Sequence, residues 1–419
     1  MTITRFATRA LPAILTVSPA LLQSQVATRT LAKPETEFTE PFSSISAIRE
    51  LRDGRVLVAD TKDKIVQLVD LKTGKASKVG REGSGPGEYA LPMQLVGLQG
   101  DTSIIYDPLN SRYLTVLPDG KPGKTFRLED GAPAPKTDKK AAVDVPASEG
   151  GPRGGPRGGG GIVTMMPPRF ADAAGHLYFE GSPISFGPNG PVASDSAPVM
   201  RYDRKTYKYD ALAFVRLPKN GAQVTSSNSG GNQNVSVRIG GRTPFPARDG
   251  WVALSNGTVV IVRVSDYHLD VISPSKQVTR GPAVAFTPVK VGDAEKQEYR
   301  ESAKGATGVG ISRTNDNGKV TTSAAPAAPA EEPSEWPAVK PAFSQNLVFA
   351  APNGEIWVAR SRSAKDEIPK YDVFSPAGKL TGQVMLPRKT RVAGFGAGGV
   401  IYTIRSDEDD LLYLQRFRG

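Results

Sequence analysis

The chain has 419 residues, of which 38% are hydrophobic, with 44 glycines, 35 prolines and no cysteine. This composition favours many short strands joined by turns, and it argues against an α/β sheet with long helical crossovers. The absence of cysteine excludes disulfide bonds, thiolate catalysis and cysteine-ligated zinc or iron–sulfur sites. The net charge of +11 comes from basic residues that form no stripe interleaved with aromatics, so we expect no nucleic-acid partner.

Residues 1–27 have the features of a secretory signal peptide. Arg5 and Arg9 precede an apolar stretch at residues 10–22, and small residues suited to cleavage follow. An apolar stretch of this length directs export and is too short to span a membrane. We therefore expect export to the periplasm, cell envelope or extracellular space, with the folded domain at residues 28–419.

A repeated unit begins with a glycine that is followed at once by an apolar run. Each run is rich in Val, Ile, Tyr or Trp, which is typical of β-strands. A second strand and a turn of Asp, Ser, Pro or Gly follow most of these runs. Two of the spacings between successive glycines are about 45 residues, the length of one propeller blade. The six glycines are Gly54, Gly100, Gly175, Gly257, Gly354 and Gly399.

Three low-complexity blocks lengthen the other spacings. They lie at residues 131–161, 219–243 and 300–338 and are rich in Gly, Pro, Ser, Asn or Ala. Segments of this composition cannot bury enough apolar surface to fold by themselves. We predict that all three are disordered insertions that loop out of the blades.

The last repeat is incomplete at the C-terminus. After Gly399 and its strand, a single strand-like segment remains at residues 411–417. A strand from residues 28–38 would complete this sheet and remove its open edge. The prediction is therefore an all-β fold, a six-bladed β-propeller whose N-terminal strand closes the last blade.

Residues 80–89 read GREGSGPGEY, which matches the pattern G-x-x-G-x-G-P-G-E followed by Phe or Tyr. Through this segment, and through the order of residues 289–303 and 341–373, the chain resembles the bacterial 6-bladed β-propeller family. This family is related to the NHL and TolB-like propellers. The resemblance implies the six-bladed fold and a short helix after the fourth blade, within residues 289–303. The family has no general activity, so the resemblance implies no function.

The same segment is the sharpest candidate for a ligand site. Its glycines and Pro86 predict a tight connection between the first two blades, on the face near the central channel where propellers bind ligands. The alternative is that the glycines only permit a sharp turn, while the last two residues tie neighbouring blades together. The side chains that could contact a ligand are Arg81, Glu82, Glu88 and Tyr89.

Metal-binding and catalytic patterns are weak. His176 and His268 are the only two histidines, too few for the three-histidine zinc pattern of propeller lyases. Acids at strand ends could supply oxygen ligands for calcium in the channel, although turns also require such acids. These acids are Asp60, Asp107 and Glu180.

We therefore predict an exported binding module that presents its loops to a protein, peptide or glycan partner in the cell envelope. It is expected to have no integral membrane span, no catalytic residue and no required cofactor. The alternative is a calcium-dependent hydrolase or lyase that uses the channel. Convergent carboxylate and amide oxygens would favour the enzyme, whereas arginine, aromatic and aliphatic side chains would favour binding. The sequence defines neither the partner nor the oligomeric state.

Overall fold

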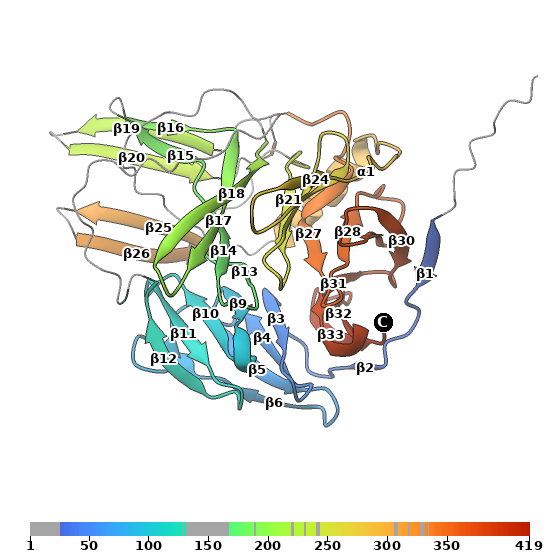
Figure 1. The fold of residues 1–419 in the computed structure, drawn as a ribbon, viewed down its shortest axis with the longest axis horizontal. Coiled ribbons are helices and arrows are strands. Elements are labelled where there is room, and N and C mark those ends of the chain that lie inside the picture. Colours follow the sequence, from blue (N-terminus) through green and yellow to red (C-terminus); the bar gives the residue numbers. More distant parts are fainter. Residues whose placement is uncertain are drawn as a thin grey trace, which may run out of the picture.

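Six sheets of four or five strands form a ring in the computed structural model (Figure 1). Within the described residues the remaining regular structure is one α-helix, α1 (Asp293–Gly305), two short 3₁₀ turns and four small two-stranded sheets. The predicted all-β, six-bladed propeller is confirmed. The described residues are 26–128, 130, 167–187, 190–218, 222–229, 232–239, 244–305, 309–316, 319–326, 332–333 and 335–419.

Each blade is an antiparallel meander whose first strand is innermost. Blade 1 contains β3 (Ala47–Glu50), β4 (Val56–Asp60), β5 (Ile65–Asp70) and β6 (Lys75–Lys78). Blade 2 contains β9 (Gln94–Gly97), β10 (Ser103–Asp107), β11 (Arg112–Val116) and β12 (Pro122–Phe126). Blade 3 contains β13 (Phe170–Ala171), β14 (Leu177–Glu180), β17 (Ser196–Asp203) and β18 (Lys208–Arg216). Blade 4 contains β21 (Gly250–Ala253), β22 (Val259–Arg263), β23 (His268–Ile272) and β24 (Val278–Arg280). Blade 5 contains β27 (Phe343–Ala350), β28 (Ile356–Arg360), β29 (Lys370–Phe374) and β30 (Leu380–Met385). Blade 6 contains β31 (Thr390–Phe395), β32 (Ile401–Ser406), β33 (Leu412–Phe417) and β2 (Thr36–Glu37).

The N-terminal segment closes the ring. β2 pairs with β33, beside the C-terminus, and so completes blade 6 from within the predicted residues 28–38 (Figure 1). The Glu37 carboxylate accepts hydrogen bonds from Arg405 at 2.9 Å and from Gln415 at 2.7 Å, which fix this pairing. β1 (Ala27–Thr30), which the sequence did not predict as a separate strand, pairs in parallel with β30 and extends blade 5.

The core lies between the blades. In β4, for example, all five residues are buried, because the two faces of this strand pack against different neighbouring blades. Among the described residues, six clusters of buried apolar side chains occur, and each of them joins two adjacent blades. Burying apolar surface stabilises a fold by about 25 cal/mol per Å², so each blade depends on both of its neighbours.

The alternation of strand direction sorts the connections onto two faces. Turns from the first to the second strand and from the third to the fourth lie on one side, here called the turn face. The other connections lie on the opposite side, here called the insertion face. The predicted insertions fall between β12 and β13, between β18 and β21, and between β24 and β27. A fourth insertion, β15 (Ile184–Gly187) with β16 (Gly190–Ala193), separates β14 from β17. All four therefore leave the ring on the insertion face.

Two of the insertions contain paired strands where the sequence analysis predicted irregular chain. β19 (Ala222–Ser229) pairs with β20 (Asn232–Ile239), and β25 (Val309–Asp316) pairs with β26 (Lys319–Pro326). The two residues between the strands are Gly-Gly in the first hairpin and Asn-Gly in the second. Such pairs favour two-residue hairpin turns. The low-complexity composition of the segments had favoured irregular chain instead. The insertion at 131–161 and residues 1–25 of the predicted signal peptide lie outside the described residues.

α1 follows blade 4, as the family resemblance implied. Its buried residue Glu295 accepts hydrogen bonds from the Ala364 amide at 3.0 Å, the Gly292 amide at 3.1 Å and the Ser363 hydroxyl at 3.1 Å. These donors, led by the Ala364 amide, lower the pKa of Glu295 to about 2. The carboxylate therefore holds the first turn of α1 against the loop of blade 5.

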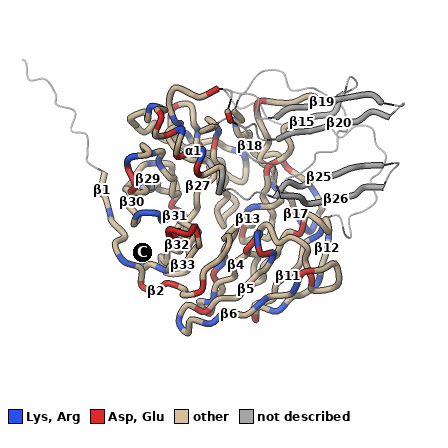
Figure 2. Tube along the Cα trace, turned by 180° about the vertical axis from the view of Figure 1, so that it is seen from behind, with Lys and Arg blue, Asp and Glu red and all other residues tan. Residues whose placement is uncertain are grey.

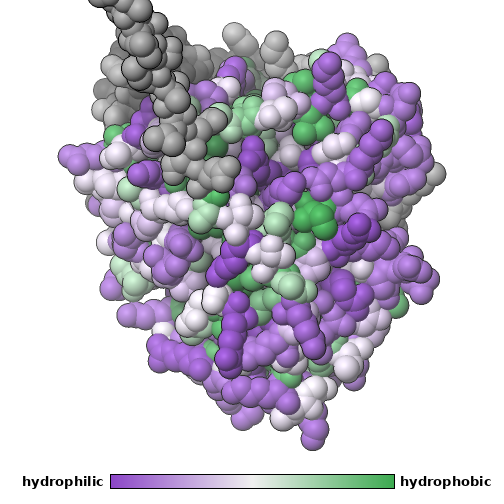
Figure 3. Space-filling model, turned by 90° about the vertical axis from the view of Figure 1, so that its right-hand side faces the viewer, coloured by the Kyte–Doolittle hydropathy of each residue, from purple (hydrophilic) through white to green (hydrophobic). Residues whose placement is uncertain are grey.

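The ring surface is polar and mixed in charge. Figure 2 shows basic and acidic residues interspersed around the blades rather than gathered by sign. On the side shown in Figure 3, the described residues present hydrophobic side chains as small spots among hydrophilic ones. Within the described part of the chain, no helix combines the length and apolarity needed to cross a membrane.

Phe38 tests the closure of the ring. Its side chain is 1% exposed and packs against Phe42, with ring centroids 5.8 Å apart. Phe38→Ala should lower the free energy of unfolding by about 3–5 kcal/mol, because it opens a cavity between blades 6 and 1. Urea denaturation measures this loss. The control Val278→Ala removes a side chain that is 54% exposed and should change stability by about 0.5 kcal/mol or less. Similar losses in both variants would contradict the closure role.

Glu295 tests the attachment of α1. Because its folded-state pKa lies near 2, below the ordinary 4.5, the ionised carboxylate stabilises the fold above about pH 4.5, and this contribution is lost as the pH falls toward 2. Glu295→Gln should therefore lower the unfolding temperature at pH 7, and its difference from the wild type should shrink between pH 4.5 and 2. Thermal unfolding followed by circular dichroism measures the difference. Glu408→Gln, at an exposed position, is the control; a pH-independent difference for Glu295→Gln would refute the assignment.

Candidate functional site

The predicted ligand loop, residues 80–89, joins the outermost strand of blade 1 to the innermost strand of blade 2, on the insertion face. Within it, β7 (Arg81–Glu82) pairs in parallel with β8 (Glu88–Tyr89). Gly83 has φ +155°, and the Glu88 carboxylate occupies the space that a Cβ would need there. The glycine is therefore required for the loop to close on itself.

Two of the four predicted side chains hold the loop together. Tyr89 is 1% exposed, and its hydroxyl accepts from the Val66 amide at 2.8 Å and donates to the Val79 carbonyl at 2.9 Å. Burial raises the pKa of Tyr89. The Glu88 carboxylate accepts from the Gly85 amide at 2.7 Å, and this bond contributes most to lowering the pKa of Glu88. Tyr89 thus ties the loop to blade 1, and Glu88 ties the loop to itself.

The other two predicted side chains point outward. Arg81 and Glu82 expose 81% and 59% of their side chains, although Arg81 also pairs with Glu88. Arg112, which the sequence analysis did not single out, supports the loop from β11 by donating to three of its carbonyls at 2.9–3.0 Å. That these side chains contact a ligand stays a prediction, with Arg81 and Glu82 the two that are accessible.

The acids considered as calcium ligands are held near their own strand ends. Asp60 accepts from the Ser44 amide at 2.9 Å and from its hydroxyl at 2.6 Å. Asp107 accepts from the amides of residues 90 and 91 and from Asn110 at 2.6–3.1 Å. Within the described ranges no three His, Cys, Asp or Glu side chains are grouped to hold a metal. The acids in the described part of the chain therefore do not fit a calcium site.

The two histidines lie apart. His176 lies on the turn face of blade 3, where its Nδ1 is 2.7 Å from Asp172. His268 begins β23 on the insertion face of blade 4, where it contacts Asp266 at 2.6 Å and Asp270 at 3.1 Å. Each is paired with acids of its own blade, so the histidines do not form a shared site.

A charged and aromatic cluster lies where blades 3 and 4 meet on the insertion face. We call it the Arg169 cluster. Each member lies next to an insertion in the chain: Arg169 and Phe170 follow the first, Glu180 precedes the β15–β16 hairpin, and Arg248 and Trp251 follow the second. Sequence patterns could not reveal this cluster, because its members come from two blades and two long insertions separate them along the chain.

Within the cluster, the Arg169 guanidinium lies over two rings. Its central carbon is 5.2 Å from the Trp251 ring centroid and 5.3 Å from that of Phe170. The Trp251 Nε1 donates to Glu180 at 3.1 Å, and Glu180 also forms an ion pair with Arg248. Trp251 is thereby fixed as a platform for Arg169.

Charge in the cluster is not balanced. Desolvation lowers the pKa of Arg169, and the positive charge of Arg248 lowers it further, while Glu180 acts in the opposite direction. Within the described part of the chain, no carboxylate pairs with the Arg169 guanidinium and no hydrogen bond holds it. Glu180 pairs with Arg248, so the positive charge of Arg169 is left beside an aromatic platform.

The innermost strands of the six blades lie around the ring axis. They contact one another in a closed circuit from β3 through β9, β13, β21, β27 and β31. Arg391 in β31 belongs to blade 6, opposite blade 3 in a six-bladed ring; it donates to the Ile45 carbonyl at 3.3 Å, and desolvation lowers its pKa. The acid on these strands is Glu50, which accepts from the Tyr402 hydroxyl at 2.7 Å. Most apolar side chains of these strands, such as Val252 and Phe343, are buried between blades and belong to the core.

No protein-family model and no curated protein matches this sequence. Among solved structures, the chain is similar to a DUF4221 family member from Bacteroides vulgatus, with 9% identity, 91% of this chain and 96% of that chain covered, and a TM-score of 0.44. It is also similar to a gluconolactonase from Xanthomonas campestris, with 9% identity, 90% and 87% coverage and a TM-score of 0.39. It is similar as well to the calcium-binding protein regucalcin from Agrobacterium tumefaciens, with 10% identity, 93% of this chain and 95% of that chain covered, and a TM-score of 0.38. These likenesses concern the fold alone.

Tyr89 tests the structural role of the loop. Tyr89→Phe leaves the buried Val79 carbonyl without its donor and the Val66 amide without its acceptor, so the free energy of unfolding should fall by about 1–3 kcal/mol. Urea denaturation measures the change. Tyr413→Phe, at a partly exposed tyrosine, serves as the control and should have a smaller effect. An unchanged stability in Tyr89→Phe would show that the tyrosine does not fasten the loop to blade 1.

Proposed function

We propose that this protein is an exported binding module that holds an acidic protein, peptide or glycan partner on its insertion face. The observation that supports this most is the Arg169 guanidinium, stacked on Trp251 and Phe170 with no carboxylate partner in the described part of the chain. The partner would bring the missing anion. No covalent chemistry is required of the site.

Arginine suits this role for a physical reason. Its planar guanidinium can stack by one face on an aromatic ring while its edge donates two parallel hydrogen bonds to a carboxylate or sulfate group. Partial burial lowers the local dielectric constant, which strengthens attraction to an anion. Because Glu180 and Trp251 fix each other at 3.1 Å, the platform is ordered before a partner arrives, and little entropy is lost on binding.

The surroundings of the cluster support a partner larger than a single small ion. Four insertions leave the ring on this face, and three of them begin or end beside the cluster in the chain. A rigid scaffold with variable loops is a common arrangement for recognition. Arg81 and Glu82, exposed on the loop between blades 1 and 2 of the same face, would provide contacts at its periphery.

The alternative of a calcium-dependent hydrolase or lyase lacks a comparable observation. Calcium requires six to eight oxygen ligands around one point. Asp60 and Asp107 are held by donors of their own loops, and Glu180 is held by Arg248 and Trp251.

The proposal is tested with two carboxylate polymers, polygalacturonate and polyglutamate, with neutral dextran as the uncharged reference. Isothermal titration at low salt should show that at least one acidic polymer binds and that dextran does not. Arg169→Gln should weaken binding at least ~10-fold, equivalent to about 1.4 kcal/mol, and added salt should weaken it further.

The control is Lys121→Gln, which removes a basic side chain that is 78% exposed in the β11–β12 turn on the opposite, turn face and should leave the affinity unchanged. Circular dichroism confirms that both variants fold. If neither acidic polymer binds, or if Arg169→Gln binds as tightly as the wild type, the proposal is wrong.

A further inference from the structure

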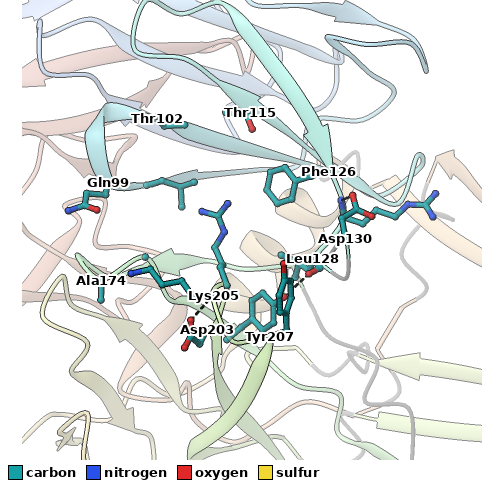
Figure 4. Close-up of a pocket in the computed structure, with 15 residues that line it drawn as sticks. Gln99, Thr102, Thr115, Phe126, Leu128, Asp130, Ala174, Asp203, Lys205 and Tyr207 are labelled. Atoms are coloured by element: carbon teal, nitrogen blue, oxygen red, sulfur yellow. Dashed lines mark hydrogen bonds between the residues drawn. The ribbon is translucent and has the colours of Figure 1, made fainter. Parts of the chain in front are cut away.

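A groove of about 650 Å³ lies between blades 2 and 3, and no member of the Arg169 cluster lines it. Figure 4 shows Thr102, Thr115 and Phe126 of blade 2 on one side and Ala174, Lys205 and Tyr207 of blade 3 on the other. Turns of both blades on the turn face contribute to its lining. Its volume falls within the range of about 300–1,000 Å³ that is usual for small-molecule sites.

The apolar part of the groove is formed before any ligand binds. Phe126, Leu98 and Leu128 line it together with Tyr202. Tyr202 is 2% exposed, and its hydroxyl donates to the Leu128 carbonyl at 2.6 Å. This bond joins blade 3 to the segment that follows β12, so the two walls are held at a fixed separation.

Three basic side chains border the groove: Arg127, Arg204 and Lys205. The Arg204 guanidinium carbon lies 5.4 Å from the Phe126 ring centroid. No described carboxylate forms an ion pair with any of the three. The basic groups are thus available to an anion beside an aromatic surface.

The two acids of the groove serve the backbone instead. Asp203 accepts from the Thr206 hydroxyl at 2.7 Å and from the Lys205 amide at 2.8 Å. These bonds, the first above all, lower the pKa of Asp203, and they fix the turn that carries Arg204 and Lys205. Asp130 accepts from the Arg127 amide at 2.6 Å. Both acids are fixed by groups of their own turns, and within the described residues neither forms an ion pair with the basic side chains.

We propose that this groove is a second binding site, which takes a small aromatic anion. The planar ring of the ligand lies against Phe126, Leu98 and Leu128, and its carboxylate or sulfonate lies between Arg204 and Lys205. The apolar surface supplies most of the affinity, and the two cations select the charge of the ligand. This site is independent of the partner proposed for the insertion face and differs from it in ligand class.

The probe is 8-anilinonaphthalene-1-sulfonate, an aromatic sulfonate whose fluorescence rises on transfer from water to an apolar site. Titration of the folded protein should show saturable binding at one site. The double variant Arg204→Gln/Lys205→Gln should weaken binding at least ~10-fold, equivalent to about 1.4 kcal/mol. Binding of the uncharged N-phenyl-1-naphthylamine should change little, because its contact with the apolar surface is retained.

Two controls separate this groove from other sites. Arg418→Gln removes an arginine that is 84% exposed and should not alter binding of the probe. Arg169→Gln should also bind the probe normally, so failure of this proposal is distinguishable from failure of the proposed partner site. The inference is overturned if the probe does not bind, if the double variant retains full affinity, or if Arg418→Gln weakens binding equally.

Discussion

The structure depends on burial of apolar surface between neighbouring blades. Every one of the six core clusters takes residues from two blades, so a blade removed from the ring would expose both of its faces to water. The ring must therefore close, and β2 closes it by pairing with β33. The same constraint explains why Phe38, near the N-terminus, is buried with Leu414, near the C-terminus.

Closure also decides where functional groups can lie. The faces of the blades are packed against each other, so few of their side chains can contact a ligand. The insertions lie in the connections between strands, which are exposed. The alternating strands place all four insertions on one face. The Arg169 cluster lies beside three of them in the chain, and the proposed partner would contact its ordered side chains as well as the insertions. The groove between blades 2 and 3 arises differently, from the gap between two neighbouring blades.

Many polar residues that look functional in the sequence maintain this architecture. Asp60, Asp107 and Asp203 each accept hydrogen bonds from backbone amides of nearby turns or loops. Tyr89 fastens an inter-blade loop to blade 1. These acids are held by hydrogen bonds, whereas no hydrogen bond or ion pair holds the guanidinium of Arg169 or Arg204 within the described residues. An arginine without an acidic partner therefore indicates a candidate binding site, whereas residue type alone does not.

Apart from the helix after blade 4, which the family resemblance implied, the sequence by itself determined the blade number, the strand repeat and the use of residues 28–38 to complete blade 6. These features follow from local patterns, namely turn glycines, apolar runs and a missing strand. The tertiary structure alone decided the pairing of β1 with blade 5, the burial of Tyr89 and the meeting of Arg169 with Trp251. Each of these depends on contacts between strands or blades distant in the chain, and no local pattern records which side chains the closed ring brings together.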